Sequence, residues 1–185
     1  GLIAPSAGDV RFMGQSIVGH SERALKPFRR QAQMVFQDPY SSLNPRLRVR
    51  EIIGEALDAH DLAQDRRDAR IAELLEMVGL QAAHATRYPH EFSGGQRQRV
   101  CIARALALKP RLIVADEAVS ALDVSIKAQV VNLLMELQAE MDLAFLFISH
   151  DMAVVERISH RVAVMYLGEI VEIGPRERII SDPAH

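Results

Sequence analysis

The stretch that decides the fold is SGGQRQRVCIARALALKPRLIVADEAVSALD, which spans Ser93 to Asp123. Ser93 is followed three residues later by Gln96, the pattern of a capping box, which predicts that a helix begins here. Gly94 and Gly95 lie between them and leave backbone amides uncovered. The start of this helix is therefore suited to binding a phosphate.

A strand and two acids follow this helix. Apolar residues recur at helical spacing as far as Pro110, which ends the helix. We interpret the basic residues of this segment as its polar positions: Arg97, Arg99, Arg104 and Lys109. The apolar run Leu112 to Ala115 predicts a buried strand, and Asp116 and Glu117 follow it directly. Ligands of α/β proteins bind where parallel strands end, so one acid can serve a metal and the other can activate a water.

The ordered combination resembles the ATP-binding cassette (ABC) ATPases. Their signature motif, Walker B motif and D-loop match Ser93 to Gln96, Leu112 to Glu117, and Ser120 to Asp123. The resemblance implies Mg²⁺-dependent hydrolysis of ATP, in which charge neutralisation and positioning supply most of the catalysis. It assigns Asp116 to holding Mg²⁺ through water and Glu117 to general-base catalysis.

Two further residues match positions of this family. Gln37 follows Met34 to Phe36, a predicted buried strand, and matches the Q-loop glutamine that binds ATP and helps to hold Mg²⁺. His150 follows the apolar run Leu143 to Ile148, and parallel strands would bring it beside the two acids. It matches the switch histidine that contacts the γ-phosphate. Outside this context, a histidine at a strand end is usually a surface or capping residue.

The resemblance also implies partners. Ser93, Gly94, Gly95 and Gln96 would bind ATP held by a second ABC subunit or cassette in a head-to-tail dimer, with Asp123 at the interface. The run Tyr40 to Arg46 resembles importers of oligopeptides, dipeptides and glutathione. The implied partners are transmembrane permease subunits and, indirectly, a periplasmic or extracellular solute-binding protein. The implied location is the cytoplasmic face of the inner membrane.

The expected fold is α/β, with a P-loop NTPase-like, mostly parallel sheet flanked by helices. Residues 1–46 and 91–185 are expected to form a RecA-like core portion, and residues 47–90 a helical subdomain that in the family docks on the membrane partner. Gly79 is placed for a left-handed helix end, and Asp123 and Asp151 are placed to cap the helices that follow them.

The family's phosphate-binding loop, G-x-x-x-x-G-K-[ST], does not occur in these residues. The chain begins at Gly1-Leu2-Ile3 as if inside an element, so we expect this loop and the N-terminal strands to precede Gly1. The isolated chain is then expected to hydrolyse ATP negligibly. Ala118 stands where the family usually has proline, a change that loosens the turn but leaves the acids in place.

The composition of the chain narrows the range of possible functions. A net charge of −2 argues against a protein held to nucleic acid by bulk electrostatics. The single cysteine, Cys101, lies on an apolar helix face and is expected to be a buried hydrophobe in a reducing setting. Two other functions stay open: a soluble cassette ATPase that acts on DNA or ribosomes, and a truncated cassette that only folds or binds a partner.

Overall fold

The computed structural model describes residues 3–60, 62 and 64–184. Its strands are β1 (Arg11–Phe12), β2 (Gln15–Ser16), β3 (Ala32–Val35), β4 (Leu112–Asp116), β5 (Ala144–Ile148), β6 (Arg161–Tyr166) and β7 (Glu169–Pro175). Its α-helices are α1 (Glu22–Gln31), α2 (Pro39–Ser42), α3 (Val49–Ala59), α4 (Arg67–Met77), α5 (Gly94–Leu106), α6 (Val124–Met141), α7 (Met152–Ile158) and α8 (Arg176–Ser181). Short 3₁₀ helices are η1 (Gln64–Arg66), η2 (Ala82–Thr86) and η3 (Pro89–Glu91). Gly1 and Leu2, at the expected entry from an earlier element, lie outside the described residues.

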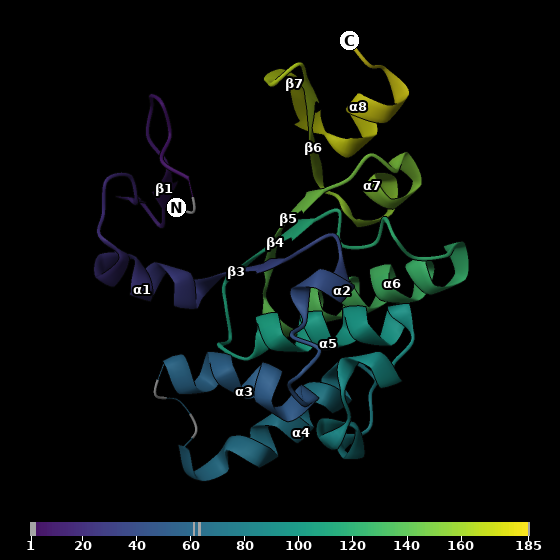
Figure 1. The fold of residues 1–185 in the computed structure, drawn as a ribbon. Coiled ribbons are helices and arrows are strands. Elements are labelled where there is room, and N and C mark those ends of the chain that lie inside the picture. The colour runs from purple at the N-terminus through teal and green to yellow at the C-terminus, as the bar shows by residue number, and fades with distance from the viewer. Residues whose placement is uncertain (1–2, 61, 63, 185) are drawn as a thin grey trace.

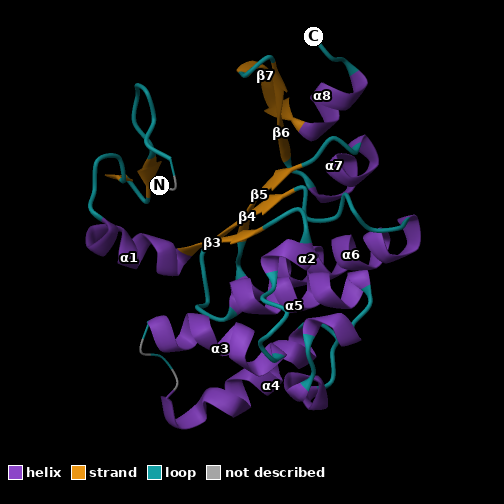
Figure 2. Cartoon of the chain, in the orientation of Figure 1, coloured by secondary structure: helices purple, strands orange, loops and turns teal. Residues whose placement is uncertain are grey.

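Three parallel strands form the central sheet, in the order β3–β4–β5 (Figures 1 and 2). Val35 lies opposite Ala115, and Asp116 lies opposite Ile148. Because the three strands run in one direction, their carboxyl ends meet at one edge of the sheet. The predicted α/β class with a parallel sheet is therefore confirmed.

The two faces of this sheet differ in how well they are covered. Val35, Ile113 and Ala115 are at most 1% exposed and belong to one apolar core with residues of α5 and α6. Leu146 and Ile148 project from the opposite face, because side chains alternate along a strand, and they are 54% and 46% exposed. Among the described residues, this second face is left partly open.

The helices α3, α4 and α5 pack together on the covered side of the sheet (Figure 1). Side chains of α5 bind backbone carbonyls in three other segments: Arg97 Nε donates to Pro89 (2.7 Å), Arg99 Nη1 to Val78 (2.6 Å) and Arg104 Nη1 to Ser42 (2.6 Å). These arginines, which the sequence identified only as polar positions of the helix, therefore also tie α5 to neighbouring segments. Val78 and Ser42 lie at the carboxyl ends of α4 and α2, where backbone carbonyls lack partners within the helix.

One local prediction, the strand over residues 34–36, also needs correction, and two segments before it have local features of their own. Met13 and Gly14 have positive φ and turn the chain between β1 and β2. The helix α1 continues through Pro27. The strand β3 ends at Val35, and Phe36 is 41% exposed because the chain leaves the sheet towards the Asp38 cap of α2.

Two other local expectations, at Gly79 and Cys101, are confirmed. Gly79 has φ +72°, the left-handed conformation expected after α4. The strands β6 and β7 form an antiparallel hairpin, with positive φ at both Leu167 and Gly168 in the turn. Cys101 is buried, and burial raises the pKa of its thiol to about 11, so it stays protonated at neutral pH.

The unequal cover of the sheet gives a matched pair of leucine substitutions. Leu134→Ala removes a side chain that is 1% exposed and should lower the free energy of unfolding by about 2–5 kcal/mol. Leu146→Ala acts at the open face and should lower it by less than about 1 kcal/mol. Urea denaturation followed by circular dichroism measures both changes. Equal losses would contradict the assignment of the two faces.

Candidate functional site

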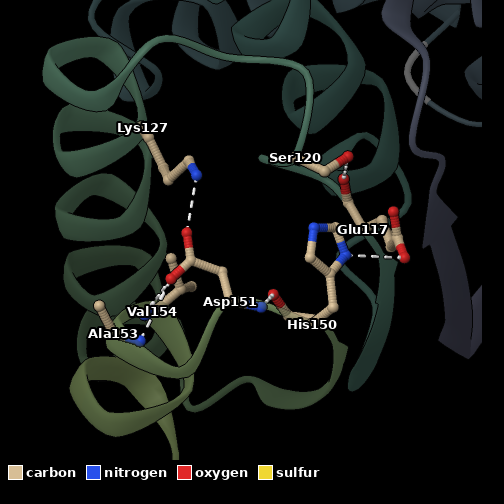
Figure 3. A network of polar contacts seen from close by, with 8 residues as sticks. Glu117, Ser120, Lys127, His150, Asp151, Ala153 and Val154 are labelled. Atoms are coloured by element: carbon tan, nitrogen blue, oxygen red, sulfur yellow. Dashed lines mark hydrogen bonds and ion pairs between the residues drawn. The ribbon is translucent and has the colours of Figure 1, made fainter.

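Glu117 is held in an unusual backbone conformation directly after β4. Its φ of 47° lies in the left-handed region, which costs a residue with a side chain about 1–3 kcal/mol. Its N–H donates to the carbonyl of Ile148 (2.9 Å), and its own carbonyl accepts from the backbone N–H (3.0 Å) and Oγ (2.9 Å) of Ser120. These bonds fix the direction in which the Glu117 side chain leaves the sheet edge (Figure 3).

Side chains from the two neighbouring strands meet the Glu117 carboxylate. Gln37, shortly after β3, donates from Nε2 to Oε2 of Glu117 (2.7 Å). His150, shortly after β5, brings Nδ1 to 3.2 Å from Oε1 (Figure 3). The structure thus brings together three of the residues that the sequence singled out, although they are far apart along the chain. Both oxygens of the carboxylate have a partner.

Asp116 is the last residue of β4 and is half-buried beside this group. Within the part of the chain that the structure describes, no three His, Cys, Asp or Glu side chains are grouped closely enough to hold a metal ion by themselves. Mg²⁺, however, usually takes one or two carboxylates and completes its shell with water and substrate phosphates. Asp116 and the amide oxygen of Gln37 are hard oxygen donors that fit such a site, and their role as ligands stays a prediction.

The helix α5 begins as the sequence predicts. Ser93 Oγ accepts from the backbone N–H of Gln96 (3.4 Å), and Gln96 Oε1 accepts from the backbone N–H of Ser93 (3.0 Å), which completes the capping box. Gly95 has a packing role that we did not foresee. It is buried, and a Cβ placed on it would lie 2.3 Å from Cγ2 of Ile126. Gly94 is less constrained, because its Cβ would approach only Leu122 at 3.9 Å.

The starts of α5 and α6 are therefore neighbours. Asp123 caps α6 by accepting from the backbone N–H of Ile126 (3.0 Å), and Ile126 packs over Gly95. Among the described residues, no hydrogen bond joins Ser93, Gln96 or Asp123 to the Glu117 cluster. The predicted site residues thus form two groups: one around Glu117, and one at the starts of α5 and α6.

An ion pair that the sequence did not reveal holds the loop that carries His150. Lys127 Nζ of α6 donates to Oδ2 of Asp151 (2.7 Å), and Oδ1 of Asp151 accepts from the backbone N–H groups of Ala153 (3.1 Å) and Val154 (3.4 Å) (Figure 3). The cap at Asp151 was predicted, but its lysine partner lies 24 residues away on another helix. No local sequence signal identifies such a partner.

This ion pair predicts a dependence of stability on pH. The hydrogen bond from Lys127 holds the pKa of Asp151 below its ordinary value of 3.8. The resulting stabilisation is complete above that ordinary value and is lost as pH falls through the lower pKa of the folded state. In thermal melts, Asp151→Asn should lower the Tm at pH 7 and flatten the fall in Tm below pH 4 that the unaltered chain shows.

Two further variants test this interpretation. Lys127→Met should reproduce the effect of Asp151→Asn, since it removes the other partner of the pair. Asp65→Asn, at an exposed position of η1, is the control and should follow the unaltered chain at every pH. An unchanged pH profile in both Asp151→Asn and Lys127→Met would contradict a contribution of the pair to stability.

Known proteins resemble this chain both in sequence and in structure. A family model described as ABC transporter matches residues 1–120. Over its full length, the chain is 61% identical to a protein of Salmonella paratyphi A named Glutathione import ATP-binding protein GsiA. It is 60% identical to proteins of the same name from Pectobacterium atrosepticum and Escherichia coli (strain K12). The chain spans 30% of the length of each of these relatives.

A solved structure supports the fold. The chain superposes on CbiO1 from Clostridium perfringens, part of the ABC transporter complex CbiONQ, with a TM-score of 0.87 and 26% sequence identity. The match covers 98% of this chain and 71% of that one. Within the described residues, no helix combines the length and the apolar composition that crossing a bilayer requires.

Proposed function

This chain belongs to the ABC transporter family, and on that premise we propose that it is part of an ATP-binding and ATP-hydrolysing subunit that powers an importer. The observation that carries the proposal is the meeting of Gln37, Glu117 and His150 at the carboxyl edge of the parallel sheet. A carboxylate with an amide and an imidazole beside it suits the positioning of water for attack on a phosphate.

We assign Glu117 the role of general base, because its left-handed backbone and its contact with Ile148 fix its carboxylate at the sheet edge. Bound Mg²⁺ would neutralise charge on the phosphates, with Asp116 as its carboxylate partner through water. Gln37 and His150 would contact the γ-phosphate. Glu117 itself would orient the attacking water and take its proton.

The present contacts of Glu117 suggest how the site responds to ATP. Gln37 donates to one of its carboxylate oxygens and His150 lies beside the other, so each oxygen already has one neighbour where a water could bind. We propose that both side chains turn from Glu117 to the γ-phosphate when ATP binds. The base would then be freed only when there is a phosphate to attack.

We assign to the second group of residues the binding of a nucleotide that a partner subunit or cassette holds. Ser93, Gly94, Gly95 and Gln96 present the amino end of α5, and Asp123 lies close by at the start of α6. In a head-to-tail dimer of ABC subunits or cassettes, this end would bind ATP held by the other copy. The separation of this group from the Glu117 cluster supports that assignment.

The transported solute and the other partners follow from the relatives. Those that match over the whole chain are named for glutathione import, so we propose a peptide-like solute, glutathione included. Residues 47–90 would form the helical subdomain that docks on transmembrane permease subunits, and residues 1–46 and 91–185 would belong to the RecA-like core. The subunit would work at the cytoplasmic face of the membrane, and a solute-binding protein would act on it only through the permease.

These 185 residues contain no G-x-x-x-x-G-K-[ST] sequence. We therefore assign to them the general base, the γ-phosphate contacts and the half-site for a partner's nucleotide, and not the amide cradle and lysine of a P-loop.

The direct test is ATP turnover by the intact protein, measured as phosphate release. Glu117→Gln should lower kcat by about 100-fold or more, since a positioned general base contributes about 10²–10⁴-fold. The KM for ATP should change little, because the amide keeps the size of the side chain and does not remove the nucleotide contacts.

Glu140→Gln provides the control, since Glu140 is exposed on α6. This variant should keep wild-type turnover. The proposal fails if the intact protein hydrolyses no ATP, or if Glu117→Gln keeps more than about a tenth of the wild-type kcat.

A further inference from the structure

A second concave region lies at the opposite edge of the sheet from Glu117. It is a cleft of about 990 Å³ between α1, the α3–α4 region and the turn from α5 to β4. Gln31 and Arg111, which line it, directly precede β3 and β4, so the cleft lies at the amino ends of these strands. The Glu117 cluster lies at their carboxyl ends. The nucleotide chemistry proposed above therefore does not account for this cleft.

One wall of the cleft is a basic face of α1. Arg23, Lys26 and Arg30 are spaced three and four residues apart, so their side chains share one side of the helix. All three are exposed, and among the described residues none of them forms an ion pair. Like charges at this spacing repel one another and destabilise a helix slightly. The mutual repulsion of these three positive charges is therefore unfavourable unless a bound anion offsets it.

The other sides of the cleft also carry positively charged side chains. Arg66 and Arg70 contribute from the start of α4, and Lys109 and Arg111 from the turn before β4. Glu73 is the single carboxylate that lines the cleft among the described residues, and it pairs with Arg70 (3.1 Å). Seven Lys and Arg side chains thus line one cleft, in a chain whose net charge is −2.

One nitrogen of the Arg70 guanidinium group lacks a hydrogen-bond acceptor among the described residues. Its side chain is 16% exposed, and its Nη2 is shielded from solvent without a hydrogen-bond partner among the described residues. A buried donor that lacks an acceptor is costly, and more so when it is charged. An anion that enters the cleft could satisfy this guanidinium after a small movement of its side chain.

We propose that this cleft binds a compact ligand that carries two or more phosphate groups. Five of the seven cations are arginines, whose planar guanidinium groups match phosphate oxygens in pairs. The volume falls in the range of small-molecule sites, about 300–1,000 Å³. Leu62, a half-buried residue that lines the cleft, would pack against the uncharged part of the ligand, a nucleoside or an acyl chain.

Titration calorimetry of the intact protein with inorganic tripolyphosphate, without divalent cations, tests the proposal. The double variant Arg30→Gln/Arg66→Gln removes one exposed cation from each side of the cleft. It should weaken binding by about tenfold or more, because charge-assisted hydrogen bonds to the phosphates are lost. The double variant Arg50→Gln/Arg178→Gln removes the same charge from exposed positions outside the cleft. It should bind tripolyphosphate like the unaltered protein.

Two further probes identify the source of the phosphate. If phosphatidylglycerol vesicles bind the protein with the same dependence on Arg30 and Arg66, and if tripolyphosphate displaces them, the ligand of the cleft is a lipid headgroup. Tripolyphosphate binding without vesicle binding would assign it to a soluble polyphosphate or nucleotide.

Other outcomes overturn the proposal. The proposal fails if the protein binds neither tripolyphosphate nor the vesicles. It also fails if the two double variants weaken binding equally, because the binding would then reflect bulk electrostatics only. Binding of polyglutamate but not of tripolyphosphate, with the same dependence on Arg30 and Arg66, would instead identify a docking surface for an acidic protein segment. Because these measurements involve neither Glu117 nor hydrolysis, they do not depend on the proposed ATPase activity.

Discussion

The parallel pairing of β4 between β3 and β5 is the constraint on which the candidate site depends. Residues that follow three strands reach one another only because those strands end at the same edge. The hydrogen bond from Glu117 N–H to the Ile148 carbonyl extends this pairing one residue beyond β4 and so sets the position of the carboxylate. Gln37 and His150 then meet it from either side. A shift of register by one residue would reverse the face of every side chain on a strand and dissolve the cluster.

The sequence was sufficient where local chemistry decides the structure. Caps at Ser93, Asp123 and Asp151 follow from short-range hydrogen bonds between side chain and backbone. The meeting of His150 with Glu117 was predictable because apolar runs preceding polar residues indicate parallel strands that end together, whereas Gln37 was assigned to this site only by the family resemblance. Features that depend on distant partners were not predictable. The Lys127–Asp151 pair, the contact of Gly95 with Ile126 and the bonds from arginines of α5 to backbone carbonyls join segments whose proximity only the folded chain decides.

The two edges of the sheet have opposite electrostatic character. Acidic side chains, Asp116 and Glu117, gather at the carboxyl edge, where a metal ion and phosphates would meet. Basic side chains gather at the amino edge, on α1, α4 and the turn before β4. The helix α5 runs between these regions, with its capping box near the start of α6 and its last turn leading into the basic cleft. A nearly neutral chain thus presents two regions of different charge, which its net charge alone conceals.

The central claim is that Glu117 is a general base that Gln37 and His150 occupy until a γ-phosphate draws them away. A crystal structure of the intact protein with Mg²⁺ and a non-hydrolysable ATP analogue tests it most directly. We expect Glu117 to lie about 2.6–3.2 Å from a water in line with the γ-phosphate. We also expect Gln37 and His150 to have moved their hydrogen bonds to the phosphate or its metal. A bound nucleotide with both side chains still on Glu117, or with its γ-phosphate away from this edge, would contradict the account.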